Sequence, residues 1–384
     1  MSTEALAIKS PLVIAAVVFM TVVSAAGFLL LPLLVGTVSS ALSFNDKELG
    51  YLSSFVLLAS AISSVGAVFW VRKINWRLAG AVSFGFMILG HSVAIFSEQA
   101  MLTVLALALA SFGGGSAYSL MLTVLSDSSQ PDRNFGFSIA AQVAFQVLGL
   151  ALLPGLIAQT GLLGLLTVLL LLDFVAMLAV LLLPGAGKTV SQLIKLSSIM
   201  QPGSLLALMG CFFFFFNVGC YWTYIERMGA ASGLAASFMG WGLSIGVAVG
   251  IAGALLAAWK GERYGRGIPL AIGAVGTVIA VLMLAGVITE ALFIASAALY
   301  NFVWNYSLAY QYAAVNAVDR SGCSVAVAPA FHSMGAALGP GLAALLMVQG
   351  DFSAVLWLIT VSVLLSLCCF VMAFALGKKT LAVI

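Results

Sequence analysis

The side chains best suited to binding a small organic molecule lie in the segment 300–312, which reads YNFVWNYSLAYQY. Tyrosine and tryptophan rings stack on flat molecules, and asparagine and glutamine amides form hydrogen bonds with them. On a helix, Asn301, Trp304 and Asn305 share one broad face, and Gln311 lies beside it. An apolar surrounding cannot satisfy the amides. This face therefore meets either closely packed helices or a polar cavity, and both interpretations stay open.

Further polar side chains recur at helical spacing inside other apolar stretches. Asn217, Tyr221 and Tyr224 follow one another at intervals of four and three residues, and Gln142 precedes Gln146 by four. Such intervals place side chains on one face of a helix. The candidate ligand-binding residues are Asn301, Trp304, Asn305, Gln311, Asn217, Tyr221, Tyr224, Gln142, Gln146, Tyr118 and Ser119. They form an aromatic, amide-rich set without charge, which suits a neutral or weakly charged, partly aromatic molecule.

Two titratable residues lie deep in apolar stretches and are candidates for carrying a proton. Histidine changes its charge near physiological pH, and His332 falls in the middle of a predicted helix. Asp173 is the second candidate, although a neighbouring side chain could hold such a carboxyl group by a hydrogen bond. His91 is interpreted as a hydrogen-bonded packing residue. No Lys or Arg lies deep in an apolar stretch, so a strongly anionic ligand would lack a partner.

The sequence contains none of the motifs that would indicate an enzyme. It has no G-x-S-x-G, no H-E-x-x-H and no paired carboxylates. Its five cysteines lack zinc-site spacing. No enzymatic activity, metal or cofactor is therefore expected, and nucleic-acid binding is excluded because no basic stripe occurs.

The composition is that of a multi-pass membrane protein. Of the 384 residues 63% are hydrophobic and 7% are charged, whereas soluble domains carry about 25% charged residues. Apolar runs of about 20 residues, the length of one membrane crossing, recur along the chain. The first run is expected to be retained as a span rather than cleaved as a signal peptide. The twelve predicted spans are 11–35, 48–71, 78–96, 101–125, 134–158, 162–183, 204–225, 233–258, 267–287, 291–315, 324–348 and 353–376.

The distribution of basic residues predicts the orientation of these spans across the membrane. With both termini on one side of the membrane, that side carries thirteen of the 15 Lys and Arg residues, and the other carries Lys47 and Arg227. Basic residues are enriched in cytoplasmic loops. Both termini are therefore expected in the cytoplasm, and the protein in a cell (inner) membrane.

Spaced similarities indicate an internal repeat. The Asp-Arg pair at 132–133 recurs at 319–320, and the Gly-Ala pair at 66–67 recurs at 253–254, in each case 187 positions later. That offset is close to half the chain, which favours a duplicated six-helix unit. The expected domains are an N-terminal six-helix bundle at 1–184, a cytoplasmic linker at 185–203 and a C-terminal six-helix bundle at 204–384.

One loop resembles a hallmark of the major facilitator superfamily. The segment 258–266, AWKGERYGR, is similar to the family's G-x-L-A-D-R-x-G-R motif and keeps an acid at Glu262 and basic residues at Arg263 and Arg266. The first-half copy at 66–77 is weaker: it keeps Arg72 and Arg77, but Trp70 stands where the family has an acid. The resemblance implies gating roles in the cytoplasmic loops for Glu262, Arg263, Arg266, Arg72 and Arg77.

A second family element, G-x-x-x-G-P, is intact as Gly335-x-x-x-Gly339-Pro340 and lacks one glycine at 149–154. Close packing of helices is the favoured interpretation of both copies.

The resemblance implies an all-α fold of two pseudo-symmetric six-helix bundles with a site at mid-membrane between the halves. It further implies a monomeric secondary transporter that moves a small organic solute by alternating access, with protons as a candidate coupling ion. The nearest alternative is a proton-antiport exporter of hydrophobic drugs or lipid-like compounds. An alternative of another class is a receptor or scaffold in the lipid bilayer that transports nothing.

Overall fold

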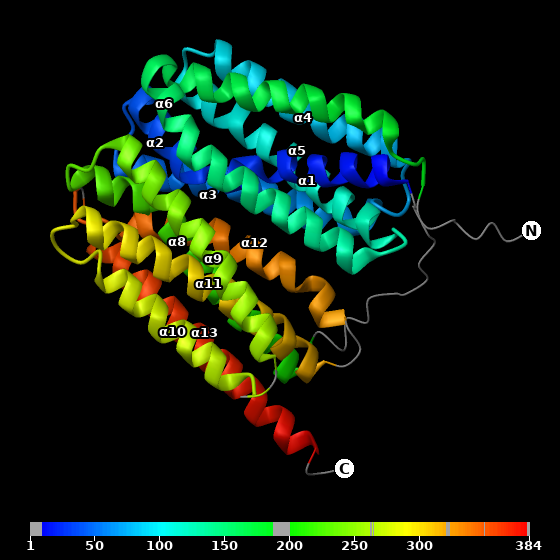
Figure 1. The fold of residues 1–384 in the computed structure, drawn as a ribbon, viewed down its shortest axis with the longest axis vertical. Coiled ribbons are helices and arrows are strands. Elements are labelled where there is room, and N and C mark those ends of the chain that lie inside the picture. The colour runs from blue at the N-terminus through cyan, green and yellow to red at the C-terminus, as the bar shows by residue number, and fades with distance from the viewer. Residues whose placement is uncertain are drawn as a thin grey trace, which may run out of the picture. The chain divides into compact units, whose positions relative to one another are not determined.

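The computed structural model describes residues 10–186, 200–261, 263, 265–319, 323–348 and 350–381. Most of the predicted linker, at 187–199, and Glu262 lie outside this part of the chain. The described residues form helices joined by short connections (Figure 1). The helices are α1 (Pro11–Leu29), α2 (Leu31–Leu42), α3 (Asp46–Trp70), α4 (Trp76–Phe96), α5 (Ala100–Ser126), α6 (Pro131–Ala179), the 3-10 turn η1 (Val180–Leu182), α8 (Pro202–Ala231), α9 (Ala236–Lys260), α10 (Gly267–Leu282), α11 (Glu290–Val318), α12 (Cys323–Leu346) and α13 (Ser353–Leu381).

The chain folds as two compact units. Unit 1 comprises Met1–Phe44 and Phe55–Gln192, and unit 2 comprises Asn45–Ser54 and Leu193–Ile384. Helix α3 therefore begins in unit 2 and continues into unit 1 after Ser54.

Eight of the described helices are long and apolar enough to cross a membrane. The longest apolar stretch, Arg133–Leu182, has 50 residues, more than twice the length that one crossing needs. Its helical conformation breaks at Gly161, where φ is 61° and ψ is −146°. A side chain with a β-carbon disfavours this conformation, so glycine allows the chain to turn there. The break falls between two predicted spans, 134–158 and 162–183.

In unit 1, α1, α4, α5 and α6 enclose one apolar core. Its largest fully buried side chains are Trp76 and Phe84 of α4, together with Met20 of α1. The indole of Trp76 donates a hydrogen bond of 2.7 Å to the carbonyl oxygen of Val71. Buried indole nitrogens need such a partner, and this one fixes the loop between α3 and α4.

In unit 2, glycines on α9 allow α11 to approach closely. Gly242, Gly246, Gly250 and Gly253 follow one another along α9 and all face α11. A β-carbon at Gly246 would lie 2.8 Å from the backbone carbonyl oxygen of Ala297. We call these four glycines the glycine seam.

Glycines on α12 play the same part against α8. A β-carbon at Gly335 or Gly339 would clash with a backbone carbonyl of α8. This contact agrees with the packing interpretation of the G-x-x-x-G-P element.

Candidate functional site

The polar segment of α11 presents its side chains to two different neighbours. Trp304 contacts aromatic residues of α8, whereas Asn305 lies against Gly250 of α9. The Asn301 amide donates to the carbonyl of Ala297 at 2.9 Å, and the Asn305 amide donates to the carbonyl of Asn301 at 3.0 Å. Both amides thus bond to their own helix beside the glycine seam. Their role in ligand binding stays a prediction.

Aromatic rings of α8 and α11 pack on His332 of α12 and on one another. The ring of Phe215 stacks on the imidazole with centroids 4.0 Å apart and planes inclined by 23°. The hydroxyl of Tyr312 lies 3.4 Å from Nδ1 of His332. The ring of Trp304 packs edge to face on the rings of Phe215 and Trp222, with centroids 6.1 Å and 6.3 Å apart. We call Phe215, Trp222, Trp304, Tyr312 and His332 the aromatic box.

The aromatic box and its surroundings contain polar atoms without a protein partner. Nε1 of Trp304 and Nε2 of His332 are buried and have no hydrogen-bond partner among the described residues. The same holds for both amide atoms of Gln311, a fully buried residue two turns beyond Trp304 on α11. Leaving a buried polar group unpaired costs about 1–3 kcal/mol. These groups are therefore suited to receive water or the polar atoms of a ligand.

By contrast, the polar side chains predicted on α8 are satisfied within unit 2. The hydroxyl of Tyr300 donates to the side-chain carbonyl of Asn217, and the rings of Tyr300 and Tyr221 stack 3.6 Å apart. Ser296 donates its only hydroxyl hydrogen to the carbonyl of Ala280 at 2.8 Å. The Tyr221 hydroxyl must therefore be the donor in its 3.0 Å bond to Ser296. This network joins α8, α10 and α11 and engages the hydroxyl hydrogen of Tyr221, and the role of Tyr221 in ligand binding stays a prediction.

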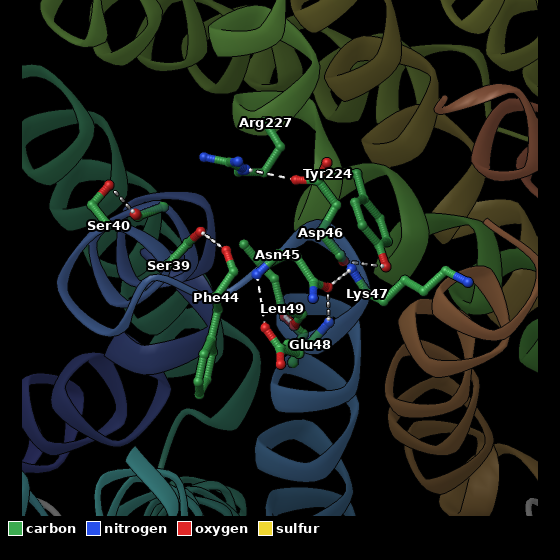
Figure 2. A network of polar contacts seen from close by, with 12 residues as sticks. Ser39, Ser40, Phe44, Asn45, Asp46, Lys47, Glu48, Leu49, Tyr224 and Arg227 are labelled. Atoms are coloured by element: carbon green, nitrogen blue, oxygen red, sulfur yellow. Dashed lines mark hydrogen bonds and ion pairs between the residues drawn. The ribbon is translucent and has the colours of Figure 1, made fainter. Parts of the chain in front are cut away.

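Tyr224 lies two turns before the end of α8, beside the start of α3 (Figure 2). Its hydroxyl is 3.3 Å from the carbonyl of Pro340 on α12 and 3.5 Å from the carbonyl of Asp46. The carboxylate of Asp46 also forms an ion pair with Arg227, at 3.0 Å from Nε. The structure thus places Tyr224 in contacts that connect α3, α8 and α12.

A capping box holds the first turn of α3 in place (Figure 2). The side chain of Asn45 accepts hydrogen bonds from the backbone N–H groups of Lys47 and Glu48, both at 3.0 Å. In return, the carboxylate of Glu48 accepts from the N–H of Asn45 at 2.8 Å. This reciprocal pattern satisfies the otherwise unpaired donors at a helix start. It fixes the position of Asp46 for its ion pair.

In unit 1 the predicted amides are also engaged with backbone. Gln146 donates to the carbonyl of Leu29 on α1 at 3.0 Å, and Gln142 donates to Ser138 of its own helix. The hydroxyl of Ser119 on α5 lies 3.4 Å from the carbonyl of Ser64 on α3. Tyr118, beside it, is half-buried. The contacts of Gln146 and Ser119 link helices, that of Gln142 stays within α6, and the ligand contacts predicted for this set remain predictions.

The buried carboxyl group of Asp173 in unit 1 has a partner that the sequence did not reveal. Nδ1 of His91 on α4 lies 2.6 Å from Oδ2 of Asp173 on α6. The His91 side chain is 9% exposed and the Asp173 side chain 1%. The two residues are 82 positions apart, so no local spacing could pair them. The sequence suggested a packing role for His91 and a proton site at Asp173 separately. In the structure these two side chains form one buried pair, so either role would involve both residues.

Comparison with known proteins rests on the fold. No protein-family model and no curated protein sequence matches the chain. Among solved structures, the nucleoside transporter NupG aligns with a TM-score of 0.73 over 94% of this chain and 100% of that chain, at 14% identity. A proton dependent oligopeptide transporter aligns with a TM-score of 0.70 over 97% of this chain and 98% of that chain, at 14% identity. A bacterial homolog of the human lysosomal transporter Spinster aligns at 0.64 over 97% and 98%, at 15% identity.

The chain has the major facilitator fold. This fold and the apolar helices identify a multi-pass membrane protein.

Within the major facilitator fold, the loop between α3 and α4 has an unexpected acid. Arg72 forms an ion pair with Asp127, at the end of α5, with Nη1 and Oδ2 2.6 Å apart. Asp127 therefore provides a carboxylate for a loop in which Trp70 replaces the acid. Arg77 donates from Nε to the carbonyl of Leu183 at 2.5 Å. Both arginines tie the loop to other parts of unit 1.

In the corresponding loop after α9, Arg263 is exposed and Arg266 is half-buried. Because Glu262 lies outside the described residues, the gating role of this loop stays a prediction.

Proposed function

We propose that this protein is a secondary transporter that moves a small, neutral or weakly charged organic solute across the cell (inner) membrane by alternating access. The observation that carries the proposal is the aromatic box, in which flat rings surround buried nitrogens that have no protein partner among the described residues. Aromatic walls with a few convergent polar groups are typical of small-molecule sites. The named activities of the structural neighbours, all transporters, support the same reading.

The proposal includes twelve membrane spans with both termini in the cytoplasm. Helices α1 and α2 together make the first span, and α6 with η1 makes the fifth and sixth on either side of Gly161. The remaining nine helices make one span each. The basic residues of the loops support this orientation.

We assign proton coupling, where it occurs, to His332. Its Nε2 has no partner among the described residues, and it accepts a proton in the tautomer in which Nδ1 carries the ring hydrogen and donates it to the hydroxyl of Tyr312. The alternative, Asp173, is held by His91.

The decisive experiment combines a binding screen with reconstitution. Purified wild-type protein and the Trp304→Phe variant are screened by thermal shift against nucleosides, short peptides, sugars and lipophilic amines. Compounds that stabilise only the wild type are then tested for uptake into proteoliposomes with and without a pH gradient. Trp357→Phe, which changes a 69% exposed tryptophan on α13, is the matched control.

Selective stabilisation by one class and its uptake are the expected results. A wild-type protein that no compound stabilises and that takes up none of them would contradict the proposal.

A further inference from the structure

A side chain from α3 enters the backbone ladder of α12 at its proline. In an α-helix each N–H bonds to the carbonyl four residues earlier, so an uninterrupted α12 would join Gly341 directly to Ala337. Here the N–H of Gly341 donates to Oγ of Ser54 at 2.6 Å. The same hydroxyl donates to the carbonyl of Ala337 at 2.5 Å. Ser54 therefore bridges the two groups that a regular helix would join.

Proline explains why this point of α12 is open to a bridge. Pro340 lacks an N–H group, and its ring crowds the preceding turn. Kinks in helices arise where a proline stands or where a side chain inserts into the ladder, and both causes meet here. Tyr224 places its hydroxyl 3.3 Å from the carbonyl of Pro340 itself. Hydroxyl groups from α3 and α8 thus form hydrogen bonds with the backbone of α12 at the point where the proline interrupts its ladder.

The other described helix with an internal proline, α6, shows no such bridge to any described residue. In α6, Gly155 follows Pro154 just as Gly341 follows Pro340. Apart from its chain neighbours and the nearby backbone of its own helix, no atom lies within 4 Å of a β-carbon placed at Gly155, whereas Oγ of Ser54 would be 2.8 Å from one at Gly341. Of these two helices, only α12 has the bridge, so the bridge is not a general consequence of a proline in a helix.

We propose that Ser54 is a positioning residue that sets the shape of α12, the helix that carries His332. With the hydroxyl in place, Ala337 and Gly341 are held apart and bridged. When the hydroxyl withdraws along α3, the two groups bond directly, and α12 takes a second form in which its hydrogen-bond ladder is continuous at this point. Because α3 continues from unit 2 into unit 1 after Ser54, movement of this helix is the step that exchanges the two forms. The role of this exchange in the transport cycle rests on the proposed function.

The bridge can be tested without a ligand. The chain contains only four Pro-Gly pairs, at 154–155, 184–185, 202–203 and 340–341. Protein labelled with ¹³C at the proline carbonyl and ¹⁵N at glycine therefore gives four correlated amide signals. Ser54→Ala is expected to shift the signal of Gly341 and leave that of Gly155 in place. Ser54→Thr, which keeps the hydroxyl, is expected to restore the wild-type position.

Ser53→Ala is the matched control, because Ser53 is buried on the same helix and bonds to the carbonyl of Leu49 in that helix. An unmoved Gly341 signal in Ser54→Ala would overturn the bridge. If Ser54→Ala does not fold, Ser54→Cys keeps the volume, weakens the hydrogen bond and supplies the same comparison.

Transport provides the second readout. Ser54→Ala is expected to change the rate of solute exchange across proteoliposomes about fivefold, the effect of one net hydrogen bond. The midpoint of solute-induced stabilisation should change less than the exchange rate, because Ser54 acts on the aromatic box only through α12. If the Gly341 signal shifts but the exchange rate does not change, Ser54 only contributes to packing, and its positioning role is overturned. Failure of the wild type to transport would instead contradict the proposed function, while the amide signals still decide the bridge.

Discussion

The two histidines of the chain occupy opposite chemical environments, one in each unit. His91 is held by a carboxylate at 2.6 Å inside unit 1. His332 is stacked on Phe215 inside unit 2, and its Nε2 has no partner among the described residues. Both are buried, with exposures of 7% and 5%.

The difference shows why burial alone does not identify a functional histidine. A paired histidine is already committed to its partner, and proton uptake would require the pair to reorganise in an apolar surrounding. A histidine with an open nitrogen can bind a proton or a ligand without breaking a protein contact. We therefore expect His91 to determine stability and His332 to determine binding and coupling.

Removing Asp173 should have the largest effect. Asp173→Ala leaves the imidazole of His91 buried without its carboxyl partner, and an unpaired buried polar group costs about 1–3 kcal/mol of stability. The melting temperature in detergent should fall steeply. The double variant His91→Leu/Asp173→Leu replaces the pair by apolar groups and should recover most of the loss. An Asp173→Ala protein that melts like the wild type would remove the structural role of this pair.

Replacing His332 should affect coupling and leave the fold intact. His332→Gln keeps a polar side chain of similar length but cannot change its charge. Accumulation of the solute driven by a pH gradient should fall to the level seen without a gradient, as measured by uptake into proteoliposomes. Transport that keeps its pH dependence in His332→Gln would show that His332 is not the coupling group. The stabilised double variant at 91 and 173 serves as the comparison, because its pH dependence should be that of the wild type.

A smaller effect is expected from the indole of Trp304. Trp304→Phe keeps an aromatic ring and removes the buried N–H, so a ligand acceptor loses its donor. The loss of one such bond, about 1–2 kcal/mol, corresponds to roughly a tenfold weaker affinity. Ligand titrations followed by thermal shift measure it, with Trp357→Phe expected to bind normally. Equal affinities for the two variants would place the ligand away from the aromatic box.

The smallest effect should come from an exposed carboxylate, Asp351, which gives a reference for the buried Asp173. The backbone N–H and the hydroxyl of Ser353 donate to it at 2.8 and 2.9 Å and lower the pKa of Asp351 below its ordinary value. A lowered folded-state pKa adds stability above the unfolded-state pKa, and this contribution is lost as the pH falls through the folded-state value. The Asp351→Asn variant should therefore have a slightly lower melting temperature than the wild type at pH 7, and the difference between the two melting temperatures should shrink below about pH 4. A difference that grows on acidification would contradict this assignment.

The sequence predicted those features that depend on a single helix. Hydropathy placed the apolar helices, because about 20 apolar residues are needed for a crossing regardless of neighbours. The predicted interruption after 158 coincides with Gly161, since glycine tolerates the unusual backbone angles found there. Loop motifs with degenerate spacing were sufficient to predict the major facilitator fold.

Features that depend on contacts between helices could not be read from the chain. Trp304 and Asn305 are adjacent and point about 100° apart on a helix, and only packing decides that one meets α8 and the other α9. The partners Arg72 and Asp127 are 55 positions apart, so their pairing required the fold. The bridge from Ser54 to α12 spans 287 positions. Proline at 340 indicated a disturbed helix, but nothing in the sequence showed which side chain would occupy the disturbance.

The glycine seam of α9 sets a limit on how this protein can vary. At two of its four positions, Gly246 and Gly253, a β-carbon would lie less than 3.0 Å from the backbone of α11, whereas Gly242 and Gly250 first meet the side chains of Phe293 and Asn305. Alanine at Gly246 or Gly253 would push the two helices apart, because backbone cannot move aside as a single side chain can. In a library of all single substitutions, Gly246 and Gly253 should remain glycine almost always, and Gly242 and Gly250 should accept alanine more often. Viable diversity along α9 should accumulate instead on its opposite face, where Trp241, Ile245 and Leu255 are exposed.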